Sequence, residues 1–266
     1  MKDLPFVMVA PNGARLTKAD HPALPVTIDE IMTCTLACRV AGADGLHAHV
    51  RDAEQRHVLD AGLYAELLSE LERLAPGFYV QITSEAAGSF TPAEQRRLVQ
   101  DLRPDAVSVA LREITAMQDE VVTRRFFALC DEAGIGVQHI LYDGADVAQL
   151  TRLVAQGDVP RAGLKALIVL GRYTIGQTSA PEDVALLAED LKSALPGVDW
   201  SACAFGPNET ACLIETMRHG GKARIGFENN RLNADGRVAV DNAERVAELV
   251  TQAKLSGLGW QQDTRS

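Results

Sequence analysis

The sequence predicts an α/β fold, a (β/α)8 TIM barrel, and three observations support this prediction. Short apolar runs alternate with longer amphipathic stretches from one end of the chain to the other. The alternation gives eight strand–helix units in 266 residues, or about 33 residues each, which matches the usual size of such barrels. The first apolar run is followed by Asn12-Gly13-Ala14. This segment lacks the glycine-rich fingerprint of a doubly wound open sheet, which is the alternative fold.

Eight segments have the composition of buried parallel strands. Each is short and rich in Val, Ile, Phe or Ala, as expected for a strand that is covered on both faces. The expected strands span residues 6–10, 45–51, 78–84, 105–111, 136–142, 164–171, 199–205 and 223–229. Because no linker interrupts the alternation of strands and helices, we expect one domain over residues 1–266.

Helix start signals lie between the expected strands. Residues 27–30 and 91–94 both have the pattern Thr-x-x-Glu. In this capping box, the threonine and the glutamate side chains each bind a backbone N–H of the first turn. Residues 180–183 place a proline and two acidic residues at the start of a further helix. The last helix is expected from Asn242 to about Leu255, with apolar residues along one face.

Composition and charge exclude several classes of protein. The chain has 26 basic and 36 acidic residues, a net charge of −10, and no long Lys/Arg block, so a nucleic-acid partner is not expected. The apolar run Leu4–Ala10 contains a proline and is too short for a signal peptide. No stretch approaches the ~20 apolar residues of a membrane helix. We therefore expect a cytoplasmic protein without a membrane partner, whose five cysteines are buried, reduced thiols.

The segment Gly45–Asp52 has the strongest functional signal. His47 and His49 are two residues apart on an expected strand, so both side chains point to the same face. If this face is the barrel interior, two imidazoles project near the carboxyl end of the strand, where active sites of this fold lie. Two imidazoles and one carboxylate are a common zinc-binding set. The alternative interpretation is two unrelated polar residues at a strand end.

A third ligand is available from the last expected strand. Arg224, Gly226 and Glu228 share one parity, whereas Ile225 and Phe227 share the other. In a closed barrel the last strand pairs with the first, which pairs with the second, so Glu228 is expected near the two histidines. The alternative is a solvated glutamate beside a loop.

Other strand ends carry polar residues that suit substrate binding. Thr83 and Ser84 end the third strand, and their hydroxyls can bond a carboxylate or a carbonyl. Ser108 lies in the fourth strand, where it either faces the site or bonds only the backbone. Arg172 follows the sixth strand and is either a cation for an anionic ligand or a solvated side chain. A nucleophilic triad is disfavoured because no G-x-S-x-G elbow is present.

The remaining histidines are not expected to bind metal. The parity of His139 places its side chain on the face of its strand opposite to the inward-facing residues. Three other histidines lie in expected loops or at helix ends, where we expect solvated side chains: His21, His57 and His219.

Several segments together resemble the zinc-dependent β-keto acid cleavage enzymes, the family of 3-keto-5-aminohexanoate cleavage enzyme. The resemblance covers almost the whole chain, and the combination of H-x-H-x-R with R-x-G-hydrophobic-E is its most specific part. The matching segments are Gly13-Ala14, Thr17–Pro22, Leu24-Pro25, His47–Asp52, Gln81–Thr83, Val169–Gly171, Gly220-Gly221 and Arg224–Glu228.

The resemblance implies a (β/α)8 barrel that assembles as a homo-oligomer, either a dimer or a tetramer. It implies that His47, His49 and Glu228 bind one zinc ion. It also implies a reaction in which a β-keto acid and the co-substrate acetyl-CoA give acetoacetate and a new acyl-CoA. Thr83 and Ser108 match positions where the family binds the keto acid through hydroxyls, and Arg224 matches an arginine of the proton-transfer network.

The sequence departs from the family pattern at several of these positions. Asn229 stands at the catalytic position where the family has an aspartate, and an amide cannot act as a general base. Ala110 replaces an asparagine two residues after the hydroxyl of the fourth strand. Gln138 and Ile140 replace a pair of glutamates in the fifth strand, and Pro207 replaces an arginine after the seventh.

Arg15 is the departure with the clearest consequence for the substrate. It replaces the acidic residue of the first loop that meets an amino group of the substrate in the family. We therefore expect Arg15 to contribute to substrate binding and the distal group of the substrate to be anionic or neutral. Two other functions are kept as alternatives: a metal-dependent hydrolase of the amidohydrolase type, and a catalytically altered relative that binds zinc and a small acid.

Overall fold

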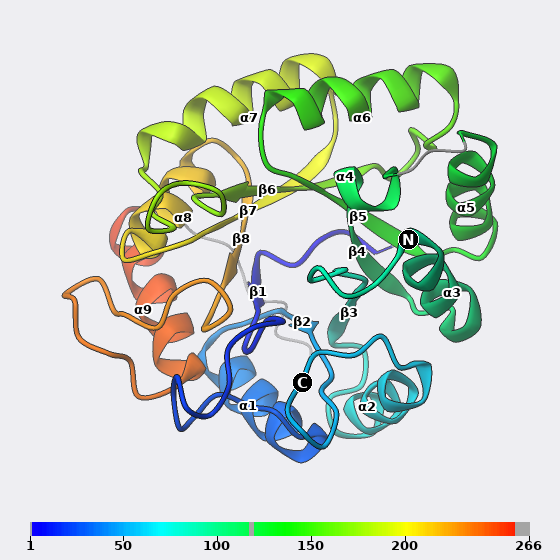
Figure 1. The fold of residues 1–266 in the computed structure, drawn as a ribbon. Helices are drawn as coiled ribbons and strands as arrows, with labels where there is room; N and C mark the ends of the chain where they lie inside the picture. Colours follow the sequence, from blue (N-terminus) through cyan, green and yellow to red (C-terminus); the bar gives the residue numbers. More distant parts are fainter. Residues whose placement is uncertain (1, 117–119, 259–266) are drawn as a thin grey trace.

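The strands form a closed parallel barrel, and the helices surround it (Figure 1). The computed structural model describes residues 2–116 and 120–258. The barrel closes because β1 (Val7–Val9) pairs with both β2 (Gly45–Ala48) and β8 (Lys222–Ile225). The predicted (β/α)8 fold is thus confirmed. In the two described ranges, no helix is long and apolar enough to cross a membrane.

Every expected strand segment overlaps one observed strand, but two strands end three or four residues earlier than expected, whereas the others end within about one residue of the expected position. β2 ends at Ala48 and β8 ends at Ile225. Gly226 ends β8 because its φ of +146° is one that few residues other than glycine adopt. A Cβ atom there would lie 2.4 Å from the carbonyl oxygen of Ala10. The other strands are β3 (Tyr79–Thr83), β4 (Ala106–Ala110), β5 (Gly136–Leu141), β6 (Lys165–Leu170) and β7 (Asp199–Ala204).

The helices follow the strands around the outside of the barrel, and a short additional helix, α4, directly follows β4. The described helices are α1 (Ile28–Ala41), α2 (Ala61–Leu74), α3 (Pro92–Leu102), α4 (Leu111–Ile114), α5 (Glu120–Glu132), α6 (Gly144–Gln156), α7 (Glu182–Ala194), α8 (Glu209–Arg218) and α9 (Asn242–Leu255).

The expected helix starts are confirmed by their hydrogen bonds. Thr27 and Thr91 each accept a bond from the backbone N–H of the glutamate three residues later, and that glutamate returns a bond to the threonine N–H. Each cap contributes about 1 kcal/mol. Helix α9 spans the predicted residues, and its side chain at Val246 is fully buried. Helix α7 differs because Pro181 offers no side-chain cap.

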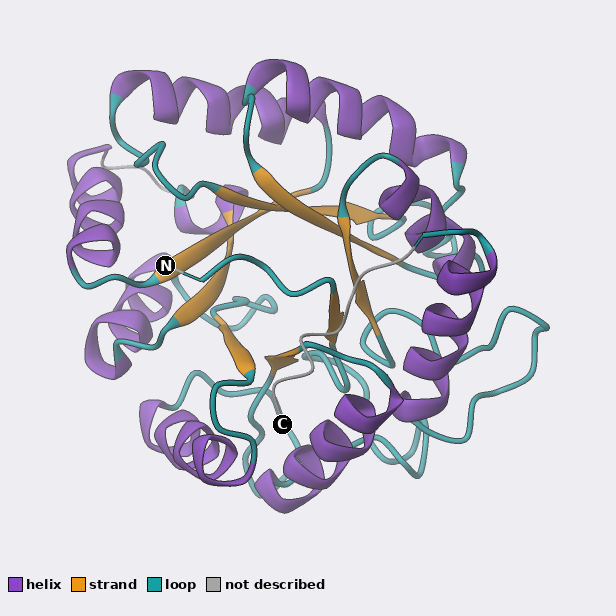
Figure 2. Cartoon of the chain, turned by 180° about the vertical axis from the view of Figure 1, so that it is seen from behind, coloured by secondary structure: helices purple, strands orange, loops and turns teal. Residues whose placement is uncertain are grey.

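Several buried apolar clusters hold the barrel together, and two of them define its wall and one of its ends. The larger lies between the strands and the surrounding helices, where residues such as Leu46 and Ile82 are fully buried. A smaller cluster of Leu4, Met8, Tyr79 and Ala106 fills the end of the barrel at which the strands begin. Figure 2 views this end, where the chain before β1 runs across the strands. The opposite end, where the strands finish, is left for the site.

The cysteines are free thiols, as predicted. Cys38, Cys130, Cys203 and Cys212 are buried, and Cys34 is half-buried.

Candidate metal centre and active site

Three side chains from two neighbouring regions of the barrel converge where the strands end. His47 lies on β2, His49 follows directly after β2, and Glu228 lies in the turn after β8 rather than on the strand itself. The two imidazole Nε2 atoms are 3.2 Å apart. Glu228 Oε2 lies 3.7 Å from His47 Nε2 and 3.5 Å from His49 Nε2. These are the three residues that the sequence analysis selected as ligands.

The spacing of these three atoms fits a divalent cation. Zinc binds nitrogen and oxygen at roughly 2.0–2.1 Å in tetrahedral geometry, which places neighbouring ligand atoms about 3.3 Å apart. Within the described part of the chain, Glu228 Oε2 is buried without a hydrogen-bond partner. A buried carboxylate oxygen is costly to leave unpaired, so a cation among these atoms would satisfy it. His47, His49 and Glu228 form the only group of this kind found in the described residues.

Both imidazoles are held in the neutral form that a metal requires. Burial lowers the pKa of His47 well below its ordinary value, and the positive charge of Arg224 lowers it further. Burial also lowers the pKa of His49, with a further contribution from His57. A neutral imidazole has one nitrogen lone pair free to bind a cation.

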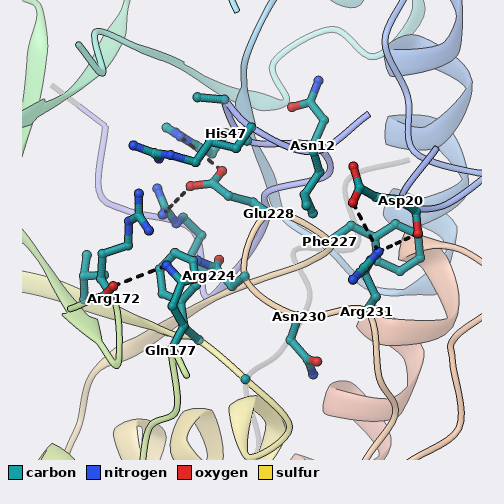
Figure 3. Close-up of a pocket in the computed structure, with 18 of the residues that line it drawn as sticks. Asn12, Asp20, His47, Arg172, Gln177, Arg224, Phe227, Glu228, Asn230 and Arg231 are labelled. Carbon is teal, nitrogen blue, oxygen red and sulfur yellow. Dashed lines mark hydrogen bonds and ion pairs between the residues drawn. The ribbon is translucent and has the colours of Figure 1, made fainter. Parts of the chain in front are cut away.

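Arg224 orients the carboxylate of Glu228. Its Nη2 donates to Glu228 Oε1 at 2.9 Å and to the sulfur of Cys203 at 3.3 Å. Burial disfavours the charged guanidinium, but Cys203 and Glu228 outweigh this effect, so the pKa of Arg224 lies above its ordinary value. One oxygen of Glu228 is therefore bound by Arg224, while the other faces His47 (Figure 3) and lies 3.5 Å from Nε2 of His49.

The turn that carries Glu228 is fixed by bonds to its backbone. Glu209 Oε1 accepts from the N–H of Gly226 at 3.2 Å, and Asn242 Oδ1 accepts from the N–H of Phe227 at 2.9 Å. The N–H of Glu228 itself donates to the carbonyl of Ala10 at 3.1 Å. Three successive backbone N–H groups are thus bound, so the position of Glu228 depends on the whole turn.

Glu209 belongs to a buried ion pair that sequence reasoning missed. Glu209 Oε2 and Arg245 Nη2 are 2.9 Å apart, and both side chains are fully buried. Burial raises the pKa of Glu209 to about 7, although Arg245 opposes this effect. No local sequence pattern indicates this pair, because its members lie on two different helices, 36 residues apart.

A pocket of about 510 Å³ opens beside the three candidate ligands. His47, Arg224 and Glu228 line one side of it (Figure 3). The lining also includes Thr83 and Arg15, which the sequence predicted to bind substrate. Further lining residues are apolar: Ile140, Val169, Phe205 and Pro207. The pocket therefore joins a charged side, which carries the candidate ligands, to an apolar side.

Four of the predicted site residues occupy different environments. Arg15 pairs with Glu85 at 3.0 Å, and the two line the pocket together. Ser84 is buried, and its hydroxyl donates to the carbonyl of Ser108 at 2.8 Å. Ser108 is buried as well, and among the described residues its hydroxyl has no partner. Asn229 lines the pocket, and neither atom of its amide is bonded within the same residues.

Three further residues hold the site in shape. Asn12 Nδ2 donates to the carbonyl of His49 at 2.9 Å, which ties the loop after β1 to a candidate ligand. Arg51 donates to the carbonyls of Gly13, Leu16 and Gln55. His47 Nδ1 lies 2.8 Å from Gln81 Oε1. Arg51 belongs to the segment Gly45–Asp52 that the sequence analysis singled out, Asn12 directly precedes the matching pair Gly13-Ala14, and Gln81 shares the inward parity of Thr83.

Two of the histidines expected in solvent are buried, so that prediction was wrong. His21 packs against Phe227, and its Nε2 lies 2.9 Å from the carbonyl of Ala239. His57 lies 5.0 Å from the ring of His49, and its Nε2 contacts the carbonyl of Glu85. Loops at the mouth of the barrel pack over these rings. His139 faces outward onto Phe127, as its parity predicted.

Comparison with known proteins gives the same family across nearly the whole chain. A family model described as beta-keto acid cleavage enzyme matches residues 5–260. A 3-keto-5-aminohexanoate cleavage enzyme from Fusobacterium nucleatum is 23% identical over 95% of this chain and 92% of its own length. A 3-oxoadipate:acetyl-CoA acetyltransferase from Cupriavidus necator is 24% identical over 95% of this chain and 89% of its own length.

Solved structures support the fold. A binary complex of ObcA with oxaloacetate has a TM-score of 0.69 and 17% identity, and the match covers 89% of this chain and 64% of that one. A 3-dehydroquinate dehydratase from Geobacillus kaustophilus has a TM-score of 0.56 and 15% identity over 94% of this chain and 92% of its own. At these identities the likeness concerns the barrel alone.

Proposed function

The chain belongs to the beta-keto acid cleavage enzyme family, and from that premise we propose that it converts a β-keto acid and acetyl-CoA into acetoacetate and a new acyl-CoA, using one divalent metal ion. The observation that carries the proposal is the convergence of His47, His49 and Glu228 beside the pocket. The named relatives use acetyl-CoA with a keto acid or cleave one, which supports the same reaction class.

The proposed reaction exchanges two acyl groups. The bond between the α-carbon and the keto carbon of the β-keto acid breaks, and the acyl group of the acid moves to the sulfur of CoA. The acetyl group leaves that sulfur and forms a new bond to the α-carbon, which gives acetoacetate. Atoms and charge balance without an oxidant, a reductant or water.

A zinc ion bound by His47, His49 and Glu228 would supply Lewis-acid chemistry toward the keto oxygen. Arg224 holds the Glu228 carboxylate in place and keeps a positive charge at the wall of the pocket. Thr83 presents its hydroxyl from the end of β3. Asn229 cannot accept a proton, but the Nδ2 atom of its unbonded amide can donate a hydrogen bond to a substrate oxygen.

The charges of the pocket favour a substrate whose distal group is an anion. Within the described residues, Arg15 pairs with Glu85, Arg224 with Glu228, and Arg231 with Asp20, whereas Arg172 has no ion pair. The Arg172 guanidinium lies over the ring of Phe205, 5.3 Å from its centroid, at the edge of the apolar side of the pocket. A β-keto dicarboxylate would place its keto acid at the candidate metal site and its second carboxylate near Arg172.

The function is tested by incubating the purified protein with acetyl-CoA and a panel of β-keto acids, with and without a chelator. We expect a new acyl-CoA that is lost on chelation and absent in His49→Ala. Hydrolysis without acyl-CoA formation would favour the amidohydrolase-like alternative instead. Ligand-induced stabilisation without turnover would favour a non-catalytic relative, for which Asn229, Ile140 and Ala110 are the motivating residues.

Within the same panel, β-keto dicarboxylates are expected to have a higher kcat/KM than amino-keto acids. A charge-neutral variant, Arg172→Gln, is expected to lower kcat/KM for the dicarboxylate about tenfold or more, as the loss of a charged hydrogen bond does. The KM for acetyl-CoA serves as the control and should change little. Preference for the amino compound would contradict the anionic distal group, and a rise in the KM for acetyl-CoA alone would assign Arg172 to the phosphates of CoA.

A further inference from the structure

A row of buried, neutral side chains crosses the barrel interior, starting at His47. His47 Nδ1 lies 2.8 Å from Gln81 Oε1, and Gln81 Nε2 donates to Gln138 Oε1 at 3.0 Å. Gln138 Nε2 donates to the backbone carbonyl of Ala166 at 3.1 Å and to the hydroxyl oxygen of Ser201 at 2.8 Å. The row joins β2, β3, β5, β6 and β7, and all of its side chains are buried.

The carbonyl of Ala166, at the end of the row remote from His47, decides which group donates and which accepts in every hydrogen bond of the row. The carbonyl of Ala166 can only accept, so the amide group of Gln138 that faces it must be the NH2 group. The oxygen of Gln138 therefore faces Gln81 and must receive an N–H. That requirement turns the oxygen of Gln81 toward His47, so the Nδ1 atom of His47 must be the donor.

We propose that Gln138 is a positioning residue that, through Gln81, fixes the proton of His47 on Nδ1 and thereby leaves Nε2 bare toward the candidate cation. The proposal rests on the metal site of the proposed function and goes beyond it, because it assigns a role to a residue on β5 that does not contact the ligand set. A ligating histidine is normally oriented by a bond to its other ring nitrogen. Here the orientation comes from two amides in series.

The two candidate histidine ligands differ in this respect. His49 Nδ1 is buried and has no hydrogen-bond partner in the described residues, and the Nε2 atoms of the two histidines are 3.2 Å apart. If Nε2 of His47 carries no proton, it can only accept a hydrogen bond. In the metal-free protein, His49 then carries its proton on Nε2 and donates it to Nε2 of His47. The two imidazoles are then opposite tautomers, and only His49 must give up or move a proton when a cation binds.

A neutral amide is required at position 138. A glutamate there would also accept from Gln81, but its carboxylate would face the carbonyl of Ala166 without a proton to donate. It would also place a charge in a fully buried position. Ile140, two residues further along β5, has no polar atom with which to extend the row. Gln138 is thus the one side chain on this strand that can anchor the direction.

The position of the proton is measured in the metal-free protein, so the test does not depend on activity. Long-range 1H–15N correlation spectra of the 15N-labelled protein distinguish the histidine tautomers. We expect His47 to carry its proton on Nδ1 and His49 on Nε2. A wild-type His47 with its proton on Nε2 would overturn the proposal without any variant.

Two variants separate direction from simple packing. Gln138→Leu removes the anchor and is expected to give mixed tautomers at His47 and a 10–100-fold weaker affinity for Zn²⁺ or Co²⁺, the usual effect of losing an outer partner of a ligand. Ser201→Ala, the matched control, removes a neighbouring bond but leaves the carbonyl of Ala166 as acceptor, so tautomer and affinity should stay unchanged.

Two results separate this inference from the metal site itself. Retention of the Nδ1 proton and of full affinity in Gln138→Leu would overturn the positioning role. Failure of the wild-type protein to bind either metal would instead overturn the proposed metal site, since the His47 tautomer is decided separately by the spectra.

Discussion

Single side chains in this barrel owe their chemistry to burial. His47, His49 and His139 are all buried, and burial lowers the pKa of each. The first two face one another and Glu228, so their neutral form suits a metal. His139 packs on Phe127 outside the barrel wall, and within the described residues its Nδ1 has no partner. Burial thus keeps His47 and His49 in the neutral form that a metal site needs. At His139 it lowers the stability of the folded protein in acid.

His139 should make the protein sensitive to mild acid. Burial lowers its pKa from 6.5 to about 4, so the folded state binds fewer protons than the unfolded state between these pH values. The free energy of unfolding should therefore fall as the pH falls through this range, by about 3 kcal/mol in total from this residue. Urea unfolding of the wild type and of His139→Leu, measured from pH 8 to pH 4, checks the effect.

The variant should lose less stability than the wild type over this range, and the two should differ little in slope above pH 7. Equal slopes in the two proteins below pH 6.5 would show that His139 is not responsible.

The individual site residues could be predicted from the sequence only in part. Strand parity and the family resemblance selected His47, His49 and Glu228, which the structure brings together; their role as ligands stays a prediction. The partners of these residues could not be found, because Gln81 and Gln138 are 57 positions apart and nothing local pairs them. The burial of His21 and His57 depends on how loops pack, which the strand pattern does not describe.

At the scale of elements, the turn after β8 has the greatest effect on the site. The sequence predicted a strand through residue 229, but Gly226 ends it and the next three residues form a turn. The alternation of side chains predicted a strand here, but it contains no information on how closely the carbonyl of Ala10 approaches Gly226. The capped helices were predictable because their signals are local: Thr27 and Thr91 bind N–H groups only three residues away.

Removing the anchor of this turn should weaken both the fold and the metal site. Glu209→Ala would leave Arg245 buried without one of its partners and the N–H of Gly226 unbonded. We expect a loss of about 3 kcal/mol in the free energy of unfolding and a weaker affinity for Zn²⁺. Urea unfolding and metal titration should be done at pH 8, where Glu209, with a pKa of about 7, is ionised.

Glu215→Ala provides the matched control on the same helix. Glu215 pairs with Arg218 at 3.0 Å on the surface, so its loss should cost no more than about 1 kcal/mol and leave metal affinity unchanged. Equal effects of the two substitutions would contradict the anchoring role of Glu209.

For the molecule as a whole, net charge and site charge have opposite signs. The chain carries −10, which does not attract an anionic substrate, so recognition of the proposed dicarboxylate must come from local cations such as Arg172. The barrel fold was predictable because eight buried strands leave a repeated pattern along the chain. Assembly into an oligomer and the extent of one domain over residues 1–266 leave no comparable local signal, and both stay predictions.

Metal binding should stabilise the whole fold, because the three candidate ligands come from β2, the residue after it and the turn after β8, at opposite ends of the chain. At a free metal concentration 100 times the Kd, the gain is about 2.7 kcal/mol. For a domain of this size it corresponds to a rise in Tm of about 5–10 °C. Thermal unfolding with Zn²⁺ and with a chelator measures it. An equal rise in His49→Ala would indicate binding elsewhere.

The central claim is most directly tested by following the acetyl carbons of acetyl-CoA. The protein is loaded with Zn²⁺ and given a β-keto dicarboxylate and acetyl-CoA labelled with ¹³C at both acetyl carbons, and the products are analysed by NMR and mass spectrometry. The exchange proposed here predicts acetoacetate labelled only at C3 and C4, together with an unlabelled new acyl-CoA. Label recovered as free acetate, or acetoacetate labelled at C1 and C2, would contradict it.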